Sequence, residues 1–417
     1  MVDLKDLKIN KQKYLTAFSN KNIFLDHEVN QVLKLYDHYL DKLSLEEKDR
    51  FALNQITKEI KSGQKPQPAL LTKAKKLSIS AKKHGNQKKL IMIRILAIAS
   101  YFPNPAGEKE IIGKNEANNK VIATFLDGKK SQNKQAPHWE TLSNHGLILE
   151  DEASYISGSR HVIYHQKAAE VIKALECFML EEHLNNGYIL IEPPVVVNEV
   201  ALYNTGQLPK FANDLYKLEN GQYLIPTAEV PLTNLGANKI YDQKDLPIKF
   251  VAATQCFRKE AGAAGKDTRG LIRLHQFRKV ELVKISQPST KEIDFKEILD
   301  MATSILIKLE LPYRTVALCT GDISFAAEKT VDIEVWMSGI NKYREISSVS
   351  SFGQFQSRRM KSRFKTSSNQ KELTTTFNAS ALAIGRTFAA IVENCLQPNG
   401  KIKVPKALLK HLSFTEF

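Results

Sequence analysis

Two long helical segments near the beginning of the chain constrain its fold more than any other feature. Apolar residues recur at steps of three or four along 27–62, in one stripe made of Val29, Val32, Leu33, Tyr36, Tyr39, Leu40, Leu43, Leu53, Ile56 and Ile60. A second helical pattern covers 69–101. Gly63, Pro66 and Pro68 lie between the two patterns and signal a turn. The sequence therefore predicts two antiparallel helices joined by a tight turn.

The apolar stripe is narrow and the rest of both segments is polar, which favours a projecting coiled-coil arm. A compact helical bundle packed on the main domain is the alternative. The run Phe102-Pro103-Asn104-Pro105 ends the helical pattern, because residues before proline are biased away from the helix. We therefore expect a helical arm over 1–105 and a second domain over 106–417, with a loop-rich connector at 106–160.

The positive charge of the chain is concentrated in this first part. The formal net charge is +15, and the first 100 residues hold 20 Lys and Arg against 10 Asp and Glu, a surplus of 10. No acidic residue occurs between Ile60 and Gly107. Such a block attracts a polyanion, of which nucleic acid is the usual one. A merely solvated, lysine-rich face is the alternative.

The composition excludes several other classes of protein. Apolar residues make up 42% of the chain, which is typical of a globular protein, and no run of about 18 apolar residues exists to cross a membrane. The beginning, MVDLKDLKINKQKY, lacks the apolar core of a secretory signal. The four cysteines are scattered without CxxC spacing, which argues against a disulfide framework and a cysteine zinc site. We expect a cytoplasmic protein with no membrane contact and no zinc.

Beyond residue 160 the pattern changes to short extended runs. Strand candidates lie at 188–192, 223–225, 248–252, 314–318, 332–336 and 343–346, and helices are expected at 165–186 and 381–394. Many strands with few intervening helices indicate an α+β domain with a mostly antiparallel sheet.

The stretch 257–284 reads FRKEAGAAGKDTRGLIRLHQFRKVELVK and predicts an antiparallel hairpin with a small-residue turn. Arg258 and Glu260 lie at its base, while Lys266, Arg269 and Arg273 form a second basic cluster. Arginines at the base suit a nucleotide polyphosphate, and a basic tip suits a larger anion.

Three further segments place polar groups in apolar surroundings. Thr227 and Glu229 are two positions apart and would face the same side of an extended segment. Glu345 and Ser348 could bind a magnesium ion that bridges phosphates. Arg386 falls inside an apolar helix and would need an anionic partner. Each segment has an ordinary alternative: a solvated strand edge, a surface ion pair and a structural carboxylate, with Ser380 as a simple helix cap.

Taken together, these segments resemble the seryl-tRNA synthetases, class II enzymes of the bacterial type. The strings that carry the resemblance are TGQLPKF (205–211), LIPTAEVPLTNL (224–235), CFRKEAGAAGKDTRGLIRLHQFRKVELVK (256–284), TGDISFAAEKTVDIEVW (320–336), REISSVSSFGQFQSRRMKSRF (344–364) and NASALAIGRTFAAIVEN (378–394). Their order and spacing cover roughly the C-terminal half of the chain. The resemblance implies a class II antiparallel sheet flanked by helices, with an N-terminal tRNA-binding arm.

The resemblance also implies the activity, in which serine and ATP give seryl-adenylate and the serine is then transferred to tRNA(Ser). Whether tRNA(Sec) is also charged stays open. A serine pocket is implied at Thr227, Ala228, Glu229, Glu281 and Ser380. ATP contacts are implied at Arg258, Lys259, Glu260, Phe277, Glu345, Ile346, Ser347, Ser348 and Arg386. Arg258 and Arg386 would be the catalytic arginines, and Glu345 and Ser348 would lie near Mg²⁺.

The partners follow from the same resemblance. The tRNA contacts expected on the arm and at the hairpin tip are Lys73, Lys75, Lys76, Lys82, Lys83, Lys266 and Arg269. A homodimer is implied, with the segment 187–194 at the subunit interface.

The chain departs from the family pattern at a few positions. Asn204 and Thr375 replace the usual glycine and histidine, and 349–351 reads Val-Ser-Ser where the family has Cys-Ser-Asn. Ala379 replaces glycine and is expected to narrow the serine pocket slightly. No charged catalytic group is lost, which favours an enzyme over a synthetase-derived, non-catalytic RNA-binding protein. A related ligase that charges a carrier protein would lack the long basic arm.

Overall fold

A computed structural model describes residues 1–62, 68–130, 135–261 and 269–417, and these form two compact units, Met1–Pro103 and Asn104–Phe417. The boundary between the units follows Pro103, two residues before the boundary predicted after residue 105. The predicted turn around Gly63 and Pro66 lies outside the described residues.

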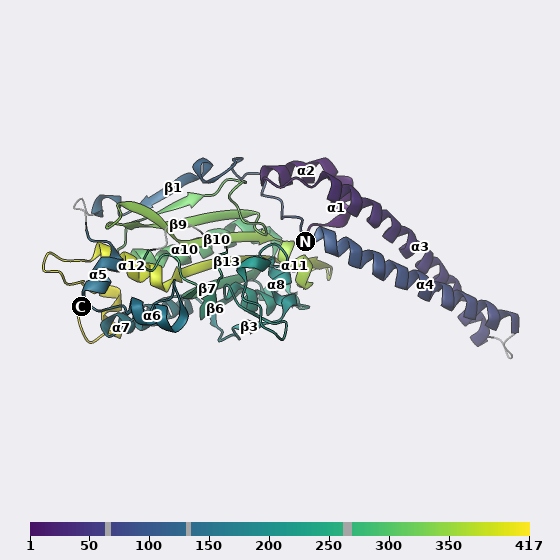
Figure 1. Cartoon of the computed structure of the whole chain (residues 1–417). Coiled ribbons are helices and arrows are strands. Elements are labelled where there is room, and N and C mark those ends of the chain that lie inside the picture. Colours follow the sequence, from purple (N-terminus) through teal and green to yellow (C-terminus); the bar gives the residue numbers. More distant parts are fainter. Residues whose placement is uncertain (63–67, 131–134, 262–268) are drawn as a thin grey trace. The chain divides into compact units, whose positions relative to one another are not determined.

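The first unit is helical, as Figure 1 shows. Its helices are α1 (Leu4–Ile9), α2 (Lys11–Asn20), α3 (Asp26–Ser62) and α4 (Pro68–Ala99). The long antiparallel pair α3 and α4 confirms the two predicted helices, whereas α1 and α2 were not predicted. The core of the unit lies where α1 and α2 meet the beginning of α3 and the end of α4, and its fully buried residues are Leu7, Phe18, Val29, Val32, Ile95, Ala99 and Phe102.

A buried acid joins the two long helices about midway along their length. Glu46 of α3 is 4% exposed, and its carboxylate pairs with Lys88 of α4 at 2.5 Å and with Arg50 at 2.6 Å. A Cβ on Gly85 would lie 3.0 Å from the Glu46 Oε1 atom. The glycine inside the predicted helix therefore gives room for this acid, and the ion pairs help to fix the register of α3 against α4.

The second unit is built on one large sheet. Among the described residues, eight strands have the order β1-β8-β9-β10-β13-β7-β6-β2, and all neighbours are antiparallel except β2 and β6. The strands are β1 (Lys120–Phe125), β2 (Ile189–Leu190), β6 (Ile248–Phe257), β7 (Gln276–Ser286), β8 (Tyr313–Ala317), β9 (Lys329–Met337), β10 (Lys342–Gly353) and β13 (Thr375–Ala383). The predicted α+β fold with a mostly antiparallel sheet is confirmed.

Helices cover both faces of this sheet (Figure 1). The helices of this unit are α5 (His138–Asn144), α6 (Glu150–Ser157), α7 (Lys167–Asn185), α8 (Glu199–Thr205), α9 (Glu229–Asn234), α10 (Lys291–Lys308), α11 (Phe355–Met360) and α12 (Ile384–Asn394). Two small sheets consist of β5 (Ile240–Asp242), β11 (Arg363–Lys365) and β12 (Lys371–Leu373), and of β3 (Val196–Val197) and β4 (Tyr223–Leu224).

Strand β7 shows how the two faces are used, because successive side chains of a strand point to opposite sides. Val280 and Leu282 join the main core with α7, α10 and α12, whereas Val283 and Ile285 pack with Ala228 of the segment that enters α9. We call these two sides the α10 face and the α9 face. The strand is buried on both, so a simple alternation of polar and apolar residues is absent from its sequence.

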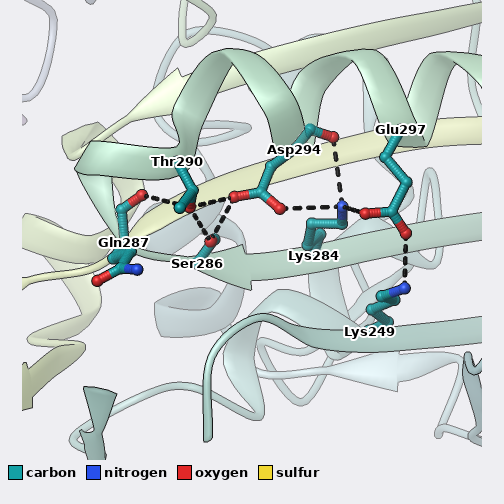
Figure 2. Close-up of polar contacts among 7 residues, drawn as sticks. All are labelled: Lys249, Lys284, Ser286, Gln287, Thr290, Asp294 and Glu297. Carbon is teal, nitrogen blue, oxygen red and sulfur yellow. Dashed lines mark hydrogen bonds and ion pairs between the residues drawn. The ribbon is translucent and has the colours of Figure 1, made fainter. Parts of the chain in front are cut away.

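A buried charge network holds α10 on its face of the sheet (Figure 2). Lys284 of β7 is 0% exposed, and its Nζ atom lies 3.1 Å from Asp294 Oδ1 and 2.6 Å from Glu297 Oε2. The other Asp294 oxygen accepts hydrogen bonds from Ser286 and Thr290. Glu297 also pairs with Lys249 at 2.6 Å. Every charge in this network has an opposite partner.

The connector and the helix content differ from the sequence expectations. Residues 106–160 contain β1, α5 and α6 rather than loops alone, and the second unit has many helices between its strands. Strand β1 was missed because it is an edge strand whose residues are almost all exposed. Among the described helices, none has the length and apolar character needed to cross a membrane.

Candidate active site

The hairpin predicted at 257–284 is formed by β6 and β7. Their antiparallel register runs from Phe257 opposite Gln276 to Ile248 opposite Ile285, and it places Glu281 opposite Ala252. Lys266 falls in 262–268, outside the described residues, whereas Arg269 is exposed. The hairpin thus positions Arg258 and Glu260 at the end of one strand and Glu281 well inside the other.

Strand β13 brings Ser380 directly opposite Glu281 on β7. The neighbouring Asn378 donates from its Nδ2 atom to Glu281 Oε1 at 2.7 Å. The alternative in which Ser380 caps the last helix is wrong, because Ser380 lies within the strand and α12 begins at Ile384. The strand continues to Ala383 because its residues pair with β7, which overrides the helical pattern expected from residue 381.

Thr227 and Glu229 do not lie on an extended segment, which corrects the sequence expectation. Glu229 is the first residue of α9, and its backbone N–H donates to the Thr227 hydroxyl at 3.2 Å. Both side chains are buried, at 4% and 5% exposed. They still face one site, because the helix begins at Glu229 and the threonine hydroxyl satisfies one of its free N–H groups.

Lys279 is the functional candidate that the sequence reasoning missed. Its Nζ atom lies 2.5 Å from Glu281 Oε2, 2.9 Å from the Thr227 hydroxyl and 3.1 Å from the Ser380 hydroxyl. It therefore contacts three of the residues assigned to the serine pocket. Its position two residues before Glu281, on the same face of one strand, was the signal available in the sequence.

These groups border a cavity of about 540 Å³. Its lining includes Thr227, Glu229, Arg258, Glu260, Lys279, Glu345, Ser348, Asn378 and Ser380. Glu281 is fully buried beside this lining and reaches it through Lys279 and Asn378. Ala228 is fully buried in the apolar cluster on the α9 face and does not line the cavity.

A second cavity of about 190 Å³ shares part of this lining. Arg258, Glu260, Lys279, Glu345 and Ser380 border both cavities, while Phe277, Ile346 and Arg386 border the second. Two residues assigned to ATP border neither. Lys259 is exposed, with its Nζ atom 5.6 Å from the centre of the Tyr216 ring, and the buried Ser347 hydroxyl donates to the Ser380 carbonyl.

The arginines are held by backbone carbonyls and an aromatic ring. The Arg258 Nε atom donates to the Pro226 carbonyl at 3.2 Å, and its guanidinium lies 5.2 Å from the centre of the Phe277 ring. The Arg386 side chain is 27% exposed rather than buried, and Nη1 donates to the Glu345 carbonyl at 2.7 Å. These contacts leave both guanidinium groups positioned at the cavities before any ligand arrives.

Glu260 has a partner within the hairpin. Its carboxylate forms an ion pair with Arg273, and its backbone has a positive φ of 50°. A positive φ is uncommon for a residue other than glycine, and such strain is concentrated at functional sites.

The segment that enters the second strand of the hairpin is anchored by a histidine that the sequence reasoning also missed. The His138 Nε2 atom accepts from the Leu271 N–H at 3.0 Å, and Nδ1 lies 2.7 Å from Glu393 Oε1. Both side chains are fully buried. A Cβ on the adjacent Gly270 would lie 2.3 Å from His138 Nε2, so only glycine fits this close approach.

Burial and like charges shift two carboxyl groups at the site. Burial, and then the neighbouring Glu281, raise the pKa of Glu229 to about 7. Burial raises the pKa of Asp332 on β9 well above its usual value, and Glu345 adds to this effect. Glu345 and Asp332 lie on paired strands, where Ser348 is opposite Asp332. The site thus combines the buried carboxyl groups of Glu229 and Asp332 with the partly exposed arginines Arg258 and Arg386.

Two of the departures from the family pattern, Asn204 and Ala379, do not border this site. Asn204 on α8 donates from Nδ2 to Asn234 Oδ1 at 2.7 Å, which ties α8 to the helix that carries Glu229. Ala379 lies in the main core on the α10 face of the sheet. The expectation that Ala379 narrows the serine pocket is therefore wrong, because its side chain points away from the side that Ser380 faces.

This fold and this site define the class of the protein: it has the core of a class II aminoacyl-tRNA synthetase. The family model for the tRNA synthetase class II core domain (G, H, P, S and T) matches residues 215–395. Among solved structures, the seryl-tRNA synthetase from Pyrococcus horikoshii complexed with ATP superposes with a TM-score of 0.89 at 31% identity, covering 100% of this chain and 99% of that chain.

The relatives narrow the class to one family. The serine–tRNA ligase of Helicobacter pylori is 42% identical over 99% of this chain and 100% of its own length. That of Pelagibacter ubique is 40% identical over 100% of this chain and 99% of its own length. The chain belongs to the serine–tRNA ligase family. The serine–tRNA ligase of Naegleria fowleri in complex with AMP, at 24% identity and a TM-score of 0.81, shares the fold and covers 96% of this chain and 94% of its own.

Proposed function

We propose that the protein activates L-serine with ATP to seryl-adenylate and transfers the serine to tRNA(Ser). The observation that carries this proposal is the convergence of an acid and hydroxyl pocket with an arginine-lined cavity, joined through Arg258, Lys279 and Ser380. Full-length similarity to serine–tRNA ligases supports it. A non-catalytic RNA-binding role fits less well, because Arg258, Glu260, Glu281, Glu345 and Arg386 are all present.

The group of Glu229, Glu281, Thr227 and Ser380 has the charge and the hydroxyls to bind a small hydroxylated ammonium ion. We assign the α-ammonium of serine to Glu229 and its hydroxyl to Glu281 and Ser380, with Thr227 at the rim. Alanine lacks the hydroxyl and would leave buried polar groups of the pocket unpaired, which is costly. Threonine keeps the hydroxyl and must be excluded by its extra methyl group.

We assign the binding of the ATP phosphates to the arginines. One carboxylate oxygen of serine attacks the α-phosphorus, the bond from that phosphorus to the bridging oxygen breaks, and pyrophosphate leaves with the electron pair. We assign the α-phosphate to Arg258, the distal phosphates to Arg386 and the adenine ring to Phe277 and Glu260. Positioning and charge neutralisation are the main requirements of such a displacement, and preorganised guanidinium groups supply both.

Glu345 and Ser348 fit a magnesium ion that accompanies ATP. Mg²⁺ prefers oxygen ligands, often one or two from the protein with the rest from phosphates and water. Both residues line the larger cavity, and the buried Asp332 Oδ1 atom beside them has no hydrogen-bond partner among the described residues. When bound, the ion would neutralise phosphate charge. No group of three or more His, Cys, Asp or Glu side chains in the described part of the chain forms a metal site by itself.

The second half of the reaction needs a tRNA. We assign its recognition to exposed lysines of α4, namely Lys73, Lys75, Lys76, Lys82 and Lys83, and its acceptor end to the hairpin tip around Arg269 and Lys266. Lysine and arginine contacts to phosphates position an RNA without reading its sequence.

A homodimer and a cytoplasmic location complete the proposal. The edge strand β2 exposes Ile189 at 53% and Leu190 at 47%, and this apolar edge supports a subunit interface at 187–194. The cysteines Cys177, Cys256, Cys319 and Cys395 are free thiols, which fits a reducing compartment.

Serine-dependent exchange between ATP and labelled pyrophosphate tests the function. We expect exchange with serine, none with alanine, and its loss in Arg258→Ala. Exchange that depends on another amino acid instead of serine, or no exchange with any amino acid, would overturn the proposal. Circular dichroism of the variant controls for its fold.

The arm is tested by a charge change on α4 that leaves the catalytic unit untouched. Replacing Lys75, Lys82 and Lys83 by Ala together should leave exchange unchanged and weaken aminoacylation of tRNA(Ser). The wild-type charging rate should fall with salt, and the variant should show a salt slope that is shallower by about one for each phosphate that it no longer neutralises. Equal decreases in both reactions would show that the arm is structural.

A further inference from the structure

Gln356, on α11, has no role in the proposed reaction and yet it contacts the site from behind. The side chain is 0% exposed, and its Nε2 atom donates to Glu229 Oε1 at 2.7 Å and to the Thr205 carbonyl at 3.1 Å. Its Oε1 atom accepts from the Thr376 hydroxyl at 2.7 Å. The amide thus joins α8, α9, α11 and β13 beneath the carboxylate assigned to the serine ammonium.

The surrounding contacts fix which end of the amide faces Glu229. A backbone carbonyl can only accept a hydrogen bond, so the Thr205 oxygen requires the nitrogen end on its side. The Thr376 hydroxyl donates to the opposite, oxygen end. A flipped amide would place its oxygen against both the Thr205 carbonyl and the Glu229 carboxylate, and would lose both of those hydrogen bonds, while the Thr376 hydroxyl could still accept from the amide nitrogen.

A neutral donor suits this position better than a charged one. Glu229 faces Glu281 and Lys279 from β7 and Arg258 from the end of β6. Burial and the Glu281 charge oppose its ionised form, and the Gln356 hydrogen bond favours it. A lysine in place of Gln356 would cancel the negative charge of Glu229, whereas an amide supports that charge and leaves it available to a cationic ligand.

We propose that Gln356 is a positioning residue for serine recognition, which holds the Glu229 carboxylate in place and in its anionic form so that it can receive the α-ammonium of serine. This inference rests on the proposed function, because it names the residue that prepares the same pocket. The Thr205 carbonyl sets the orientation of the amide, and the Thr376 hydroxyl supports it by bonding the oxygen end.

The test uses the full-length protein and serine-dependent pyrophosphate exchange. Gln356→Leu keeps the volume but removes the donor. A hydrogen bond to a buried charged group corresponds to a change of roughly 10- to 100-fold, and we expect the KM for serine to rise by that factor. The KM for ATP should change less than about twofold. The acidic limb of kcat/KM for serine should also move to higher pH, because the variant makes ionised Glu229 less favourable.

A matched pair of variants separates positioning from simple loss of stability. Thr376→Val should raise the KM for serine by about 2- to 10-fold, and Thr376→Ser, which keeps the hydroxyl, should restore it. Thr374→Val is the control: this residue is also fully buried, and its hydroxyl bonds Ser357 and Ser362 at 2.8 Å each, with no link to Glu229. It should lower the melting temperature and leave the KM for serine unchanged.

The possible outcomes are distinct. An unchanged KM for serine in Gln356→Leu would overturn the inference, as would an equal rise for ATP or for the Thr374→Val control. If Gln356→Leu does not fold, the Thr376→Val and Thr376→Ser pair decides by the same criterion. A wild-type protein that shows no exchange with serine would instead reject the proposed function itself.

Discussion

Strand β7 carries two buried charge clusters, one on each face of the sheet, and they differ in one respect. The α10-face cluster consists of Lys249, Lys284, Asp294 and Glu297, and its two positive charges balance its two negative ones. The α9-face cluster on β7 has the cation Lys279 for the two acids Glu281 and Glu229; Arg258, which also faces Glu229, is the arginine that we propose for the α-phosphate of ATP. The first is complete without a ligand. The second has one negative charge in excess, which a bound ammonium ion would balance.

This difference distinguishes buried charges that stabilise the fold from buried charges that a ligand balances. A paired network contributes to the fold, and a change that leaves a buried charge without any partner is costly. A cluster with an excess charge stores unfavourable energy that a ligand can relieve. We therefore expect changes on the α10 face to alter stability, and changes on the α9 face to alter serine binding.

The largest effect is expected from Lys284→Met on the α10 face. The change leaves Asp294, which is 3% exposed, without its cation, and removing one partner of a buried pair costs ~3–5 kcal/mol. Urea unfolding should show this decrease in stability, while the KM for serine of the folded protein should not change. Glu297→Gln serves as the control: its side chain is 34% exposed, so its effect on stability should be under ~1 kcal/mol. A raised KM for serine in Lys284→Met would contradict the comparison.

Glu281→Gln tests the α9 face and should have the next largest effect. The amide keeps the shape but removes a charge, and we expect kcat/KM for serine to fall by about 10²–10³, or ~3–4 kcal/mol. Stability should stay the same or rise, because Glu229 and Lys279 then form a balanced pair. A decrease in both stability and activity would show that the α9-face cluster is as structural as the other.

The pH dependence of serine binding should give the smallest effect, about 1.4 kcal/mol per pH unit. The pKa of Glu229 is raised to about 7, so below that pH the carboxyl is protonated and cannot pair with the ammonium. We expect kcat/KM for serine to fall about tenfold per pH unit below pH 7. A Glu229→Gln variant should lack this limb, and an unchanged limb there would assign it to another group.

The stability of the ligand-free protein should change in the opposite direction. A carboxyl with a raised pKa contributes stability that is present below its unfolded value and is lost as the pH rises through about 7. Thermal unfolding with and without serine measures this: relative to Glu229→Gln, the ligand-free protein should lose stability as the pH rises from the ordinary carboxyl pKa of 4.5 to about 7 and then level off, and serine should reverse the difference.

The sequence predicted those parts of the molecule whose signals are local. The stripe from Val29 to Ile60 predicted the long helix α3, because a helical face is visible at steps of three and four. The hairpin of β6 and β7 followed from two apolar runs around a small-residue turn. The grouping of Glu229, Glu281 and Ser380 came instead from resemblance, since no local pattern joins three segments so far apart.

The features that the sequence could not predict depend on pairing across the fold. Ser380 lies in a strand and not at a helix cap because β13 is held between β7 and β10. Lys279 and Lys284 are both lysines in one buried strand, and only the packing of α9 and α10 on opposite faces gives them different partners. Gln356 lies within one of the family motifs, but nothing in its neighbours predicts that its amide reaches Glu229.

The small core at the base of the arm lies entirely within the first unit. Phe102, the last residue before Pro103, is fully buried, and its ring lies 5.7 Å from that of Phe18 in α2. A polypeptide of residues 1–103 thus contains all of the buried residues of this core, whereas one that stopped at Tyr101 would lack the Phe102 ring that packs on Phe18. The first unit therefore carries all of its own hydrophobic core before the proline that follows it.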